Sequence, residues 1–417
     1  MSVADVVAQL TEGQVPLRLT AWDGSAVGPP DSDVQLHVAS ERGLATLLAA
    51  PGDFGLARAY VSGELRLEGV HPGDPYNALR AVQQWQLRRP PARTAMSLAR
   101  IVGVRRLVSP PRPAVEAPPR WRRAVRHHTP LVDAATVRHH YDVSNAFYEL
   151  VLGPSMTYSC AVFEKPDATL EEAQDAKLDL VCRKLGLRPG MRFLDVGCGW
   201  GAMVLHAARH HGVEATAITL SPEQAAYARD AVRSSGLEGR VRILELDYRD
   251  VADGPYDAVS SIGMLEHVGV RRYAGYFSRL RDLLAPGGRL LNHAITRPDG
   301  RARARPGAFI DRYVFPDGEL PSPARVVGAA HDAGLEVRHD ESLREHYAMT
   351  LAAWGSNLVR HWDEAVRLVG IERARVWGLY MAGSRLSFEQ NALQVHQVLA
   401  VRTSDGDSGM PLRPDWA

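Results

Sequence analysis

The stretch LDVGCGWG, residues 194–201, decides the fold class of this chain. It joins a short apolar run to a helical pattern through Gly197, Gly199 and Gly201. Glycines at such a junction permit a tight turn and let a ligand approach the backbone at the N-terminus of the next helix. A dinucleotide-binding loop has the spacing G-x-G-x-x-G, and the third glycine here comes too early for it. The loop therefore does not favour NAD, and tight packing of strand against helix is the alternative to a nucleotide site.

Strand-like and helix-like segments alternate on both sides of this stretch, from about residue 130 to 300. Helical runs such as ATLEEAQDAKLDLVCRKLGL and SPEQAAYARDAVRSSG separate apolar runs such as VEATAITLS and YDAVSSIGM. This alternation predicts an α/β fold with a doubly wound, mostly parallel sheet, whose ligands bind beyond the carboxyl ends of the strands. Beyond residue 300 the pattern predicts helices, one of them over 347–370, and a final apolar run, LQVHQVLAV, that fits an edge strand.

The first part of the chain has a different pattern. Residues 1–87 combine short strand-like runs, a helical run and many glycines, which predicts a small α+β domain. Residues 88–130 are rich in proline and arginine, with Glu116 as the acid between residues 88 and 126. They predict a linker, which is either a solvated connector or a basic patch that holds the protein near anionic phospholipid headgroups. Residues 131–417 then form the α/β domain.

The composition limits the partners and the location of the chain. Its 417 residues include 49 basic and 48 acidic side chains, so no global field attracts nucleic acid. Three cysteines, Cys160, Cys182 and Cys198, are too few for a disulfide framework, and their spacing matches no metal site. No signal peptide or membrane span is predicted, which favours the cytoplasm.

Polar side chains follow successive strands of the predicted sheet. After Asp195 in the glycine loop, the next strand ends in TLSPEQ, with Thr219, Ser221 and Gln224, and the third ends in LDYRD. Polar groups at three neighbouring strand ends predict one elongated ligand laid across them, and S-adenosylmethionine fits this description. A fourth strand runs into SIGMLEHVG and Glu266. Burying that carboxylate costs several kcal/mol unless it has a partner, so we expect a partner in the fold.

Several motifs together resemble the cyclopropane fatty acid synthase and mycolic acid cyclopropane synthase family, in its actinobacterial type. They are LDVGCGWG, TLSPEQ, SIGMLEHVG and LLNHAIT, with HHYDVSNAFYELVLGPSMTYSCAVFE, YVFPDGELPS and LREHYAMTLAAW. The resemblance spans about 135–400, and GDFGLARAYVSGE at 52–64 is similar to the N-terminal domain of phospholipid-modifying members. It implies the class I fold of S-adenosylmethionine-dependent methyltransferases, with helical insertions that bind an acyl chain. It also implies transfer of a methyl or methylene group to the double bond of an unsaturated phospholipid acyl chain, at the inner face of the membrane.

The resemblance implies two sets of site residues. Members of this family hold a bicarbonate ion, and the matching positions here are Cys160, Glu266, His293, the backbone of Ile295, and Tyr347. The aromatic faces of Tyr141, Tyr158 and Tyr347 are candidates to stabilise a carbocation. The implied donor-binding residues are Tyr158, Ser159, Asp195, Gly197, Gly199, Trp200, Gly201, Thr219, Ser221, Gln224, Asp247 and Tyr248. The second strand has no acid for the ribose hydroxyls, and we expect Gln224 to take that role.

The product stays open between two outcomes. If the carbocation loses a proton from the new methyl carbon as the ring closes, the product is a cyclopropane. If a hydride shifts first, the product is a 10-methylene chain, a precursor of 10-methyl fatty acids, and a separate reductase would follow. Leu265, Asn292 and Ser384 depart from the pattern of cyclopropane synthases. Whether the chain forms a homodimer is also open.

Two other classes of protein compete with this interpretation. A methyltransferase for a small polar metabolite shares the glycine loop but has no use for the set Cys160, Glu266, His293 and Tyr347. A non-catalytic module that binds S-adenosylmethionine or lipid is favoured only where Glu266 or His293 is replaced, and both are present.

Overall fold

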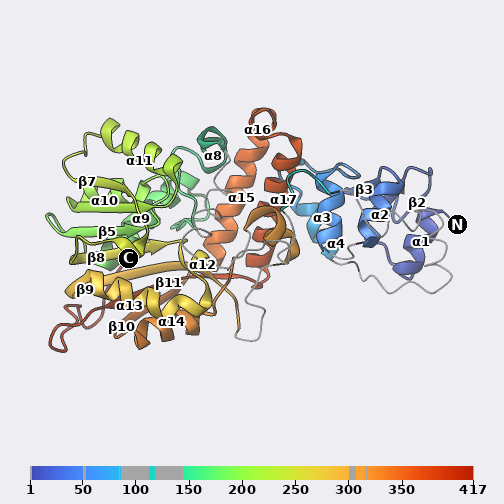
Figure 1. Cartoon of the computed structure of the whole chain (residues 1–417). Helices are drawn as coiled ribbons and strands as arrows, with labels where there is room; N and C mark the ends of the chain where they lie inside the picture. Colours follow the sequence, from blue (N-terminus) through green and yellow to red (C-terminus); the bar gives the residue numbers. More distant parts are fainter. Residues whose placement is uncertain are drawn as a thin grey trace. The chain divides into compact units, whose positions relative to one another are not determined.

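The computed structural model describes residues 2–49, 53–83, 85, 112–117, 144–299, 307–315 and 318–416, in two compact units (Figure 1). The first unit is made of Met1–Arg123, Gly307–Pro316 and Trp354–Leu386, and the second of Ala124–Pro306, Asp317–Ala353 and Ser387–Ala417. This division differs from the predicted boundaries at residues 87 and 130, because the helical segment after residue 353 belongs to the first unit. The predicted linker lies outside the described residues except for 112–117.

The first unit contains an α+β arrangement near its N-terminus. Its elements are α1 (Val3–Leu10), β1 (Arg18–Ala21), β2 (Ala26–Val27), β3 (Gln35–Val38), α2 (Glu41–Ala49), α3 (Asp53–Val61), β4 (Leu65–Glu68), α4 (Tyr76–Gln83), η4 (Ile310–Val314), α16 (Trp362–Val369) and most of α17 (Ile371–Glu389). The sheet order is β2-β1-β3-β4, and β1 is parallel to β3. Alternate strand residues such as Leu19 and Leu36 are buried with Val3 and Val6 of α1, so one face of this sheet carries the core.

A buried carboxylate joins three segments of the first unit. The side chain of Glu116 is 0% exposed, and its oxygens accept hydrogen bonds from Nε and Nη2 of Arg58, each at 2.7 Å. Arg312 also donates to this carboxylate, as does the hydroxyl of Tyr313 at 2.9 Å. The acid of the predicted linker is therefore held in the first unit by a full set of donors.

The second unit is built on a seven-stranded sheet. Its strands are β5 (Arg192–Val196), β6 (Glu214–Thr219), β7 (Val241–Glu245), β8 (Tyr256–Ile262), β9 (Leu284–Thr296), β10 (Glu336–Ser342) and β11 (Gln394–Val401). Their order is β10-β11-β9-β8-β5-β6-β7. The strands from β5 to β9 pair in parallel, whereas β11 is antiparallel to both β9 and β10. The predicted doubly wound, mostly parallel sheet is thus confirmed.

Helices cover both faces of this sheet (Figure 1). The helical elements are α8 (Asn145–Leu152), α9 (Leu170–Leu185), α10 (Ala202–His211), α11 (Pro222–Ser234), η2 (Tyr248–Asp250), α12 (Leu265–Val268), η3 (Val270–Arg272), α13 (Tyr273–Leu283), α14 (Pro323–Asp332) and α15 (Arg344–Arg360), whose last turns lie in the first unit. On one face α9 and α10 pack through residues such as Val181 and Val204. On the other face α13 and α14 pack through Phe277 and Val326. Burial on both faces explains the nearly continuous apolar strands of the sequence.

Two predicted elements in the C-terminal part were wrong. The run LQVHQVLAV forms β11, which lies between β9 and β10 and is not an edge strand. Its last five residues are all buried, as expected of an interior strand. The edge strand is β10, EVRHDES, whose mixture of charged and half-buried residues has little hydrophobic signal. The predicted helix over 347–370 is two helices, because α15 ends at Arg360 and α16 begins at Trp362.

The strand order places a ligand crevice beside the glycine loop. After β5 the chain builds β6 and β7 on one side, and β8 and β9 on the other. The segments that follow β5 and β8 therefore separate from each other at the carboxyl ends of adjacent strands, which is where doubly wound sheets bind ligands. Within the described ranges, no helix has the length and apolar character needed to cross a bilayer.

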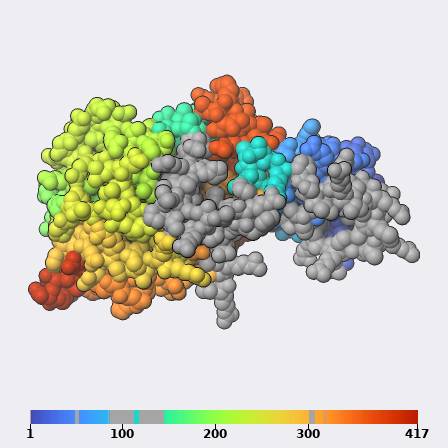
Figure 2. Space-filling view, in the orientation of Figure 1, coloured from blue at the N-terminus to red at the C-terminus, as the bar shows by residue number. Residues whose placement is uncertain are grey.

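The last described residues pack against the second unit. Nη2 of Arg289 in β9 donates to the carbonyl oxygen of Gly409 at 3.0 Å. Figure 2 shows this C-terminal tail as dark red atoms beside the yellow segment that contains β9. The ring of Trp416 lies 4.4 Å from the ring of His339 and 5.8 Å from Nζ of Lys184. The C-terminal tail thus packs beside Lys184.

Candidate active site

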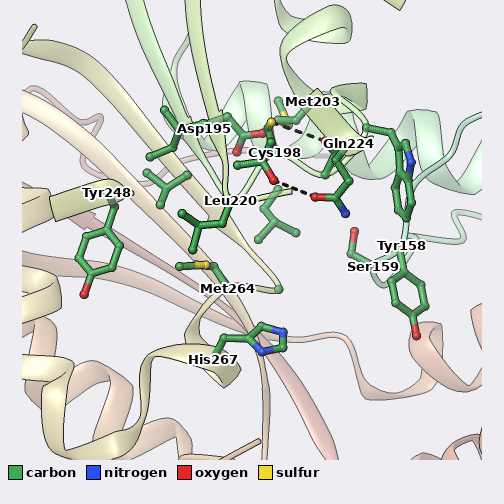
Figure 3. A pocket seen from close by; sticks show the side chains of 18 of the residues that line it. Tyr158, Ser159, Asp195, Cys198, Met203, Leu220, Gln224, Tyr248, Met264 and His267 are labelled. Carbon is green, nitrogen blue, oxygen red and sulfur yellow. Dashed lines mark hydrogen bonds between the residues drawn. The ribbon is translucent and has the colours of Figure 1, made fainter. Parts of the chain in front are cut away.

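A pocket opens at the carboxyl ends of β5, β6, β7 and β8 (Figure 3). Its lining residues come from the segments that follow all four of these strands. Most of the residues predicted to bind the methyl donor line it, namely Tyr158, Ser159, Asp195, Gly197, Gly199, Trp200, Thr219, Gln224, Asp247 and Tyr248. Gly201 and Ser221 do not line it. The polar strand ends therefore converge as the sequence predicted.

The glycine loop serves two purposes. Gly197 and Gly199, with φ of +81° and +54°, line the pocket in the left-handed conformation that favours glycine. Gly201 instead precedes α10, and a Cβ on it would lie 3.1 Å from Cβ of Ala228 in α11. The packing alternative thus applies to Gly201, whereas Gly197 and Gly199 give a ligand access to the backbone.

The end of β6 presents an amide to the pocket. Oγ1 of Thr219 donates to Oε1 of Gln224 at 2.8 Å, which directs the amide nitrogen of Gln224 toward the pocket (Figure 3). Oγ of Ser221 accepts from the backbone N–H of Gln224 at 3.2 Å and caps α11. Ser221 is therefore placed to position Gln224. An amide N–H can bind hydroxyl oxygens, which agrees with the ribose role expected of Gln224.

The end of β7 carries an ion pair. Asp247 accepts from Nε and Nη2 of Arg249, each at 2.7 Å. Burial acts to raise the pKa of Asp247, but the hydrogen bonds from Arg249 outweigh it and hold the pKa below its usual value. Tyr248 lines the pocket beside this pair and packs edge-on against Tyr276, with ring centroids 5.0 Å apart. Arg249 was not among the predicted residues.

An aromatic part of the wall depends on α8. The indole N–H of Trp200 donates to Oδ1 of Asn145 at 2.9 Å. The ring of Tyr148 lies 4.7 Å from that of Trp200 and 5.8 Å from that of Tyr158. Helix α8 thus holds two predicted donor residues in place. Tyr141, predicted to stabilise a cation, lies outside the described residues.

Lys177 and Asp195 place opposite charges at the pocket. Lys177, on the apolar side of α9, is 1% exposed and donates to Oγ of Ser159 at 3.1 Å. Burial lowers the pKa of Lys177 to about 8. Asp195 accepts from Oγ of Ser260 at 2.5 Å, and burial raises the pKa of Asp195 to about 6. Lys177 was not predicted; its signal was a lysine within an apolar helical stripe.

Glu266 has half of the partners that its carboxylate needs. Oε1 accepts from the backbone N–H of Ile295 at 2.7 Å. Oε2 is buried and has no hydrogen-bond partner among the described residues. Burial raises the pKa of Glu266 to about 7, and the N–H of Ile295 offsets part of that effect. Two predicted residues are thus in contact, and one carboxylate oxygen is available to a ligand.

A chain of hydrogen bonds fixes the proton of His293. Nζ of Lys184 donates to Oε1 of Gln397 at 2.7 Å, and Nε2 of Gln397 lies 3.1 Å from Nδ1 of His293. Because a lysine only donates, the oxygen of Gln397 faces Lys184 and its NH₂ group faces His293. Nδ1 of His293 therefore accepts, and the proton of the neutral ring is on Nε2. That atom is buried with no partner within the described ranges.

Charge and burial keep His293 neutral. Burial, and then the nearby Lys177 and Lys184, lower the pKa of His293 to about 3. Lys184 is 1% exposed and pairs on its other side with Glu341 of β10. Lys184 and Gln397 were not predicted, because their contact with His293 depends on the position of β11.

Cys160 and Tyr347 meet at the start of α15. Sγ of Cys160 lies 3.6 Å from the carbonyl oxygen of Leu343, and the backbone N–H of Tyr347 donates to the same oxygen at 3.1 Å. The N–H of Leu343 donates to the carbonyl of Val395 at 2.9 Å, and Val395 pairs with Ile295 across β11 and β9. A continuous backbone path therefore connects all five predicted catalytic residues. Burial raises the pKa of Cys160, so it remains a thiol.

The pocket for the methyl donor is in contact with the cluster of predicted catalytic residues, which are Cys160, Glu266, His293, Ile295 and Tyr347. Gly263 lines the pocket, and its N–H donates to the carbonyl oxygen of His293 at 2.9 Å. Ser159 lines the pocket and immediately precedes Cys160. Lys177, which also lines the pocket, acts on the pKa values of both Cys160 and His293. Gly263, Ser159 and Lys177 therefore connect the pocket with this cluster, although neither Glu266 nor His293 lines the pocket itself.

Two departures from the family pattern lie on the other side of β9. Asn292 precedes His293, and neighbouring residues of a strand point to opposite faces. The residues on either side of Asn292 in the same register, Leu290 and Ala294, belong to the core under α13, as does Leu265. Both side-chain amide atoms of Asn292 are buried with no partner in the described part of the chain. Asn292 and Leu265 therefore face this core rather than His293.

A doubly wound sheet with a glycine loop after its first strand, and a pocket across four strand ends, defines a class I S-adenosylmethionine-dependent methyltransferase. Known proteins assign the family. Residues 128–398 match the model described as mycolic acid cyclopropane synthetase, so this chain belongs to that family.

Curated and solved relatives agree with this assignment. The chain is 51% identical to a probable fatty acid methyltransferase of Mycobacterium tuberculosis, over 100% of this chain and 98% of that protein. It is 40% identical to a probable fatty acid methyltransferase of Pseudomonas putida, over 98% of both. A crystal structure of mycolic acid cyclopropane synthase CmaA1, complexed with SAH and CTAB, is 38% identical over 64% of this chain and 97% of that chain, with a TM-score of 0.61.

Proposed function

We propose that this methyltransferase transfers a methyl or methylene group from S-adenosylmethionine to the double bond of an unsaturated fatty acyl chain of a phospholipid. The observation that carries the proposal is that two buried atoms, Oε2 of Glu266 and Nε2 of His293, each have no hydrogen-bond partner among the described residues. Transfer to a small polar acceptor has no need of such a pair, because the acceptor itself loses a proton to water or to one base.

The two orphaned atoms fit a bicarbonate ion. Oε2 of Glu266 is an acceptor for the hydroxyl of such an ion, and Nε2–H of His293 is a donor to its oxygens. The N–H of Ile295 holds Glu266, so this backbone group positions the carboxylate. Bicarbonate bound there would supply the weak base that accepts the proton lost from the alkylated chain.

The residues of the chain account for the rest of the chemistry. An alkene is a poor nucleophile, so the sulfonium methyl must be held in line with the double bond and away from water. The strand-end residues, including Asp195 and Gln224, hold the donor in this role. Methyl transfer forms the new C–C bond, breaks the S–CH₃ bond and leaves a carbocation on the acyl chain. In this proposal the aromatic faces of Tyr158, which lines the pocket, and of Tyr347 stabilise that cation.

The proposal is tested with purified protein, S-adenosylmethionine, bicarbonate and vesicles of an anionic dioleoyl phospholipid. Mass spectrometry of the released fatty acids should show a gain of one CH₂ per oleoyl chain. A product that resists mild hydrogenation is a cyclopropane, and one that takes up two hydrogens to give a methyl branch is a methylene chain. Methylation of a water-soluble acceptor with unchanged lipid would overturn the proposal, as would donor binding without any turnover.

The proposal includes peripheral association with the inner face of the membrane, where unsaturated phospholipid chains are found. Co-sedimentation with the same vesicles, compared with vesicles of neutral phospholipid, measures this association. Stronger sedimentation with anionic vesicles is expected from the arginine-rich segment, residues 88–126. Equal sedimentation with both would contradict a role for this segment.

A further inference from the structure

Two helices of the second unit bring together a set of metal-ligating side chains that lies outside the pocket. Cys182 is on α9, and His206 and His211 are on α10. One ligand atom from each of the three residues lies within 4.8 Å of the other two. Cys182 is on a different helix from the two histidines, and the spacing of the cysteines alone had indicated no metal site.

The donor atoms of this cluster are available to a ligand. Nε2 of His206 is buried and has no hydrogen-bond partner among the described residues. Cys182 is 0% exposed, and its thiol adjoins the two half-buried histidines. The histidines give an ion access from solvent.

A carboxylate supports the third ligand. Nε2 of His211 lies 3.2 Å from Oδ1 of Asp179, and Oδ2 of Asp179 forms an ion pair with Nε of Arg183 at 2.8 Å. When Nε2–H of His211 donates to the carboxylate, Nδ1 carries the lone pair. A histidine that binds metal through one nitrogen and a carboxylate through the other is the usual arrangement around a protein-bound metal.

A simpler explanation accounts for only part of this cluster. Basic side chains are favourable near the C-terminus of a helix, and Arg209, His210 and His211 occupy the last turn of α10. That effect explains His211. It does not explain why Nε2 of His206 is buried without a partner, or why both rings adjoin a thiol.

We propose that Cys182, His206 and His211 form a binding site for one divalent transition-metal ion, with zinc as the best match. One sulfur and two imidazole nitrogens suit Zn²⁺ and exclude Mg²⁺ and Ca²⁺, which prefer oxygen. Metal–ligand distances of about 2.0–2.3 Å place ligand atoms about 3.3–3.6 Å apart in a tetrahedron, which small side-chain rotations can reach from the observed cluster. A water molecule completes the four ligands. Binding releases the thiol proton of Cys182 to solvent.

The ion would join two helices that also serve the donor pocket. Helix α9 carries Lys177, which donates to Ser159 in the wall of the pocket. Helix α10 begins directly after Gly201 of the glycine loop. The expected role is therefore structural, namely to hold α9 against α10, and it is independent of the proposed reaction on lipid.

The site is tested by cobalt spectroscopy on untagged full-length protein treated with a chelator. At micromolar Co²⁺ we expect one equivalent to bind, with a thiolate-to-cobalt charge-transfer band and the intense visible bands of a tetrahedral site, all displaced by Zn²⁺. Cys182→Ser should abolish the charge-transfer band. His206→Gln and His211→Gln should each weaken binding by at least tenfold, as should Asp179→Asn, since orienting partners contribute about 10–100-fold to metal affinity.

The control is His331→Gln, which removes an exposed histidine of α14 that is not part of the cluster. It should bind Co²⁺ as the wild type does, and circular dichroism should show that every variant is folded. Zinc should also raise the midpoint of thermal unfolding of the wild type but not of Cys182→Ser. Absence of the charge-transfer band in the wild type, or equal affinity in the wild type and Cys182→Ser, would overturn the proposal.

Discussion

Two buried carboxylates, one in each unit, differ in how many hydrogen bonds they accept. Glu116 in the first unit receives hydrogen bonds from Arg58, Arg312 and Tyr313. Glu266 in the second unit receives one, from the N–H of Ile295, and its Oε2 has no partner within the described ranges. An unsatisfied buried acceptor costs about 1–3 kcal/mol, so a chain retains one only where something repays it. Both carboxylates are buried, so burial does not distinguish them. A carboxylate oxygen without a hydrogen-bond partner indicates a ligand site, whereas a fully hydrogen-bonded carboxylate stabilises the fold.

The largest expected effect is on the satisfied carboxylate. Glu116→Gln leaves two arginines without a counter-charge in a buried site, so we expect the free energy of unfolding to fall by about 3–5 kcal/mol in urea denaturation. Donor binding by the native variant should be unchanged, because Glu116 is not in the pocket. Asp230→Asn, which breaks an exposed pair with Arg233, is the control and should cost at most about 1 kcal/mol. Equal losses of stability in the two variants would contradict the stabilising role of the buried Glu116.

The pH dependence of stability should identify the unsatisfied carboxylate. The pKa of Glu266 is about 7 in the folded chain, whereas the ordinary pKa of a glutamate is 4.5, so the folded chain binds more protons between these two pH values. Its contribution to stability is complete below pH 4.5 and is lost as the pH rises to 7. We expect Glu266→Gln to gain roughly 3 kcal/mol relative to the wild type over this range. The difference between the two proteins cancels the titration of other groups, and a difference that does not vary with pH would refute the assignment.

We expect the substitution of Glu266 to affect turnover as strongly as it affects stability. Glu266→Gln removes the acceptor at Oε2 and should lower turnover by at least about 100-fold while leaving S-adenosylmethionine binding nearly intact. Labelled-methyl transfer to vesicles and calorimetric titration of the donor measure the two quantities. Glu319→Gln is the matched control, since Glu319 accepts from the N–H of Val270 near the same helix and should matter little to turnover. Unchanged turnover of Glu266→Gln with bicarbonate supplied would refute the role.

A smaller effect is expected from Gln397, which orients His293. Gln397→Glu offers a carboxylate that accepts from both Lys184 and His293, so the proton of His293 should move from Nε2 to Nδ1. Nitrogen-15 NMR of the histidine ring reports this change directly. Turnover should fall about tenfold, the low end for a residue that orients a ligand group, and more bicarbonate should be needed. Gln394→Glu on the same strand is the control; a tautomer that stays on Nε2 in Gln397→Glu would contradict the hydrogen-bond chain.

The parts that the sequence predicted are those with local signals. The glycine loop and the TLSPEQ segment each lie within one strand, one loop and the start of one helix, so the residues themselves carry the pattern. Glu266 and Ile295 are farther apart, and only the resemblance of their motifs to a known family paired them. Gln397 and Lys184 carried no such signal. Gln397 contacts His293, and Lys184 contacts Gln397, only because β11 lies beside β9 with Gln397 opposite His293, and β11 had been assigned to the edge of the sheet.

The position of β11 also sets the order in which the site can form during synthesis. The pocket side of the sheet, β5 to β8, is complete once Ile262 has left the ribosome, whereas β11 begins at Gln394 and supplies Val395 and Gln397 to the catalytic cluster. At about 5–20 residues per second, the interval lasts on the order of ten seconds. A nascent chain therefore passes through a stage in which the donor side can fold while Glu266 and His293 lack their last neighbours. Under the proposed mechanism, methyl transfer becomes available only when the final strand inserts, so an incomplete chain cannot consume S-adenosylmethionine.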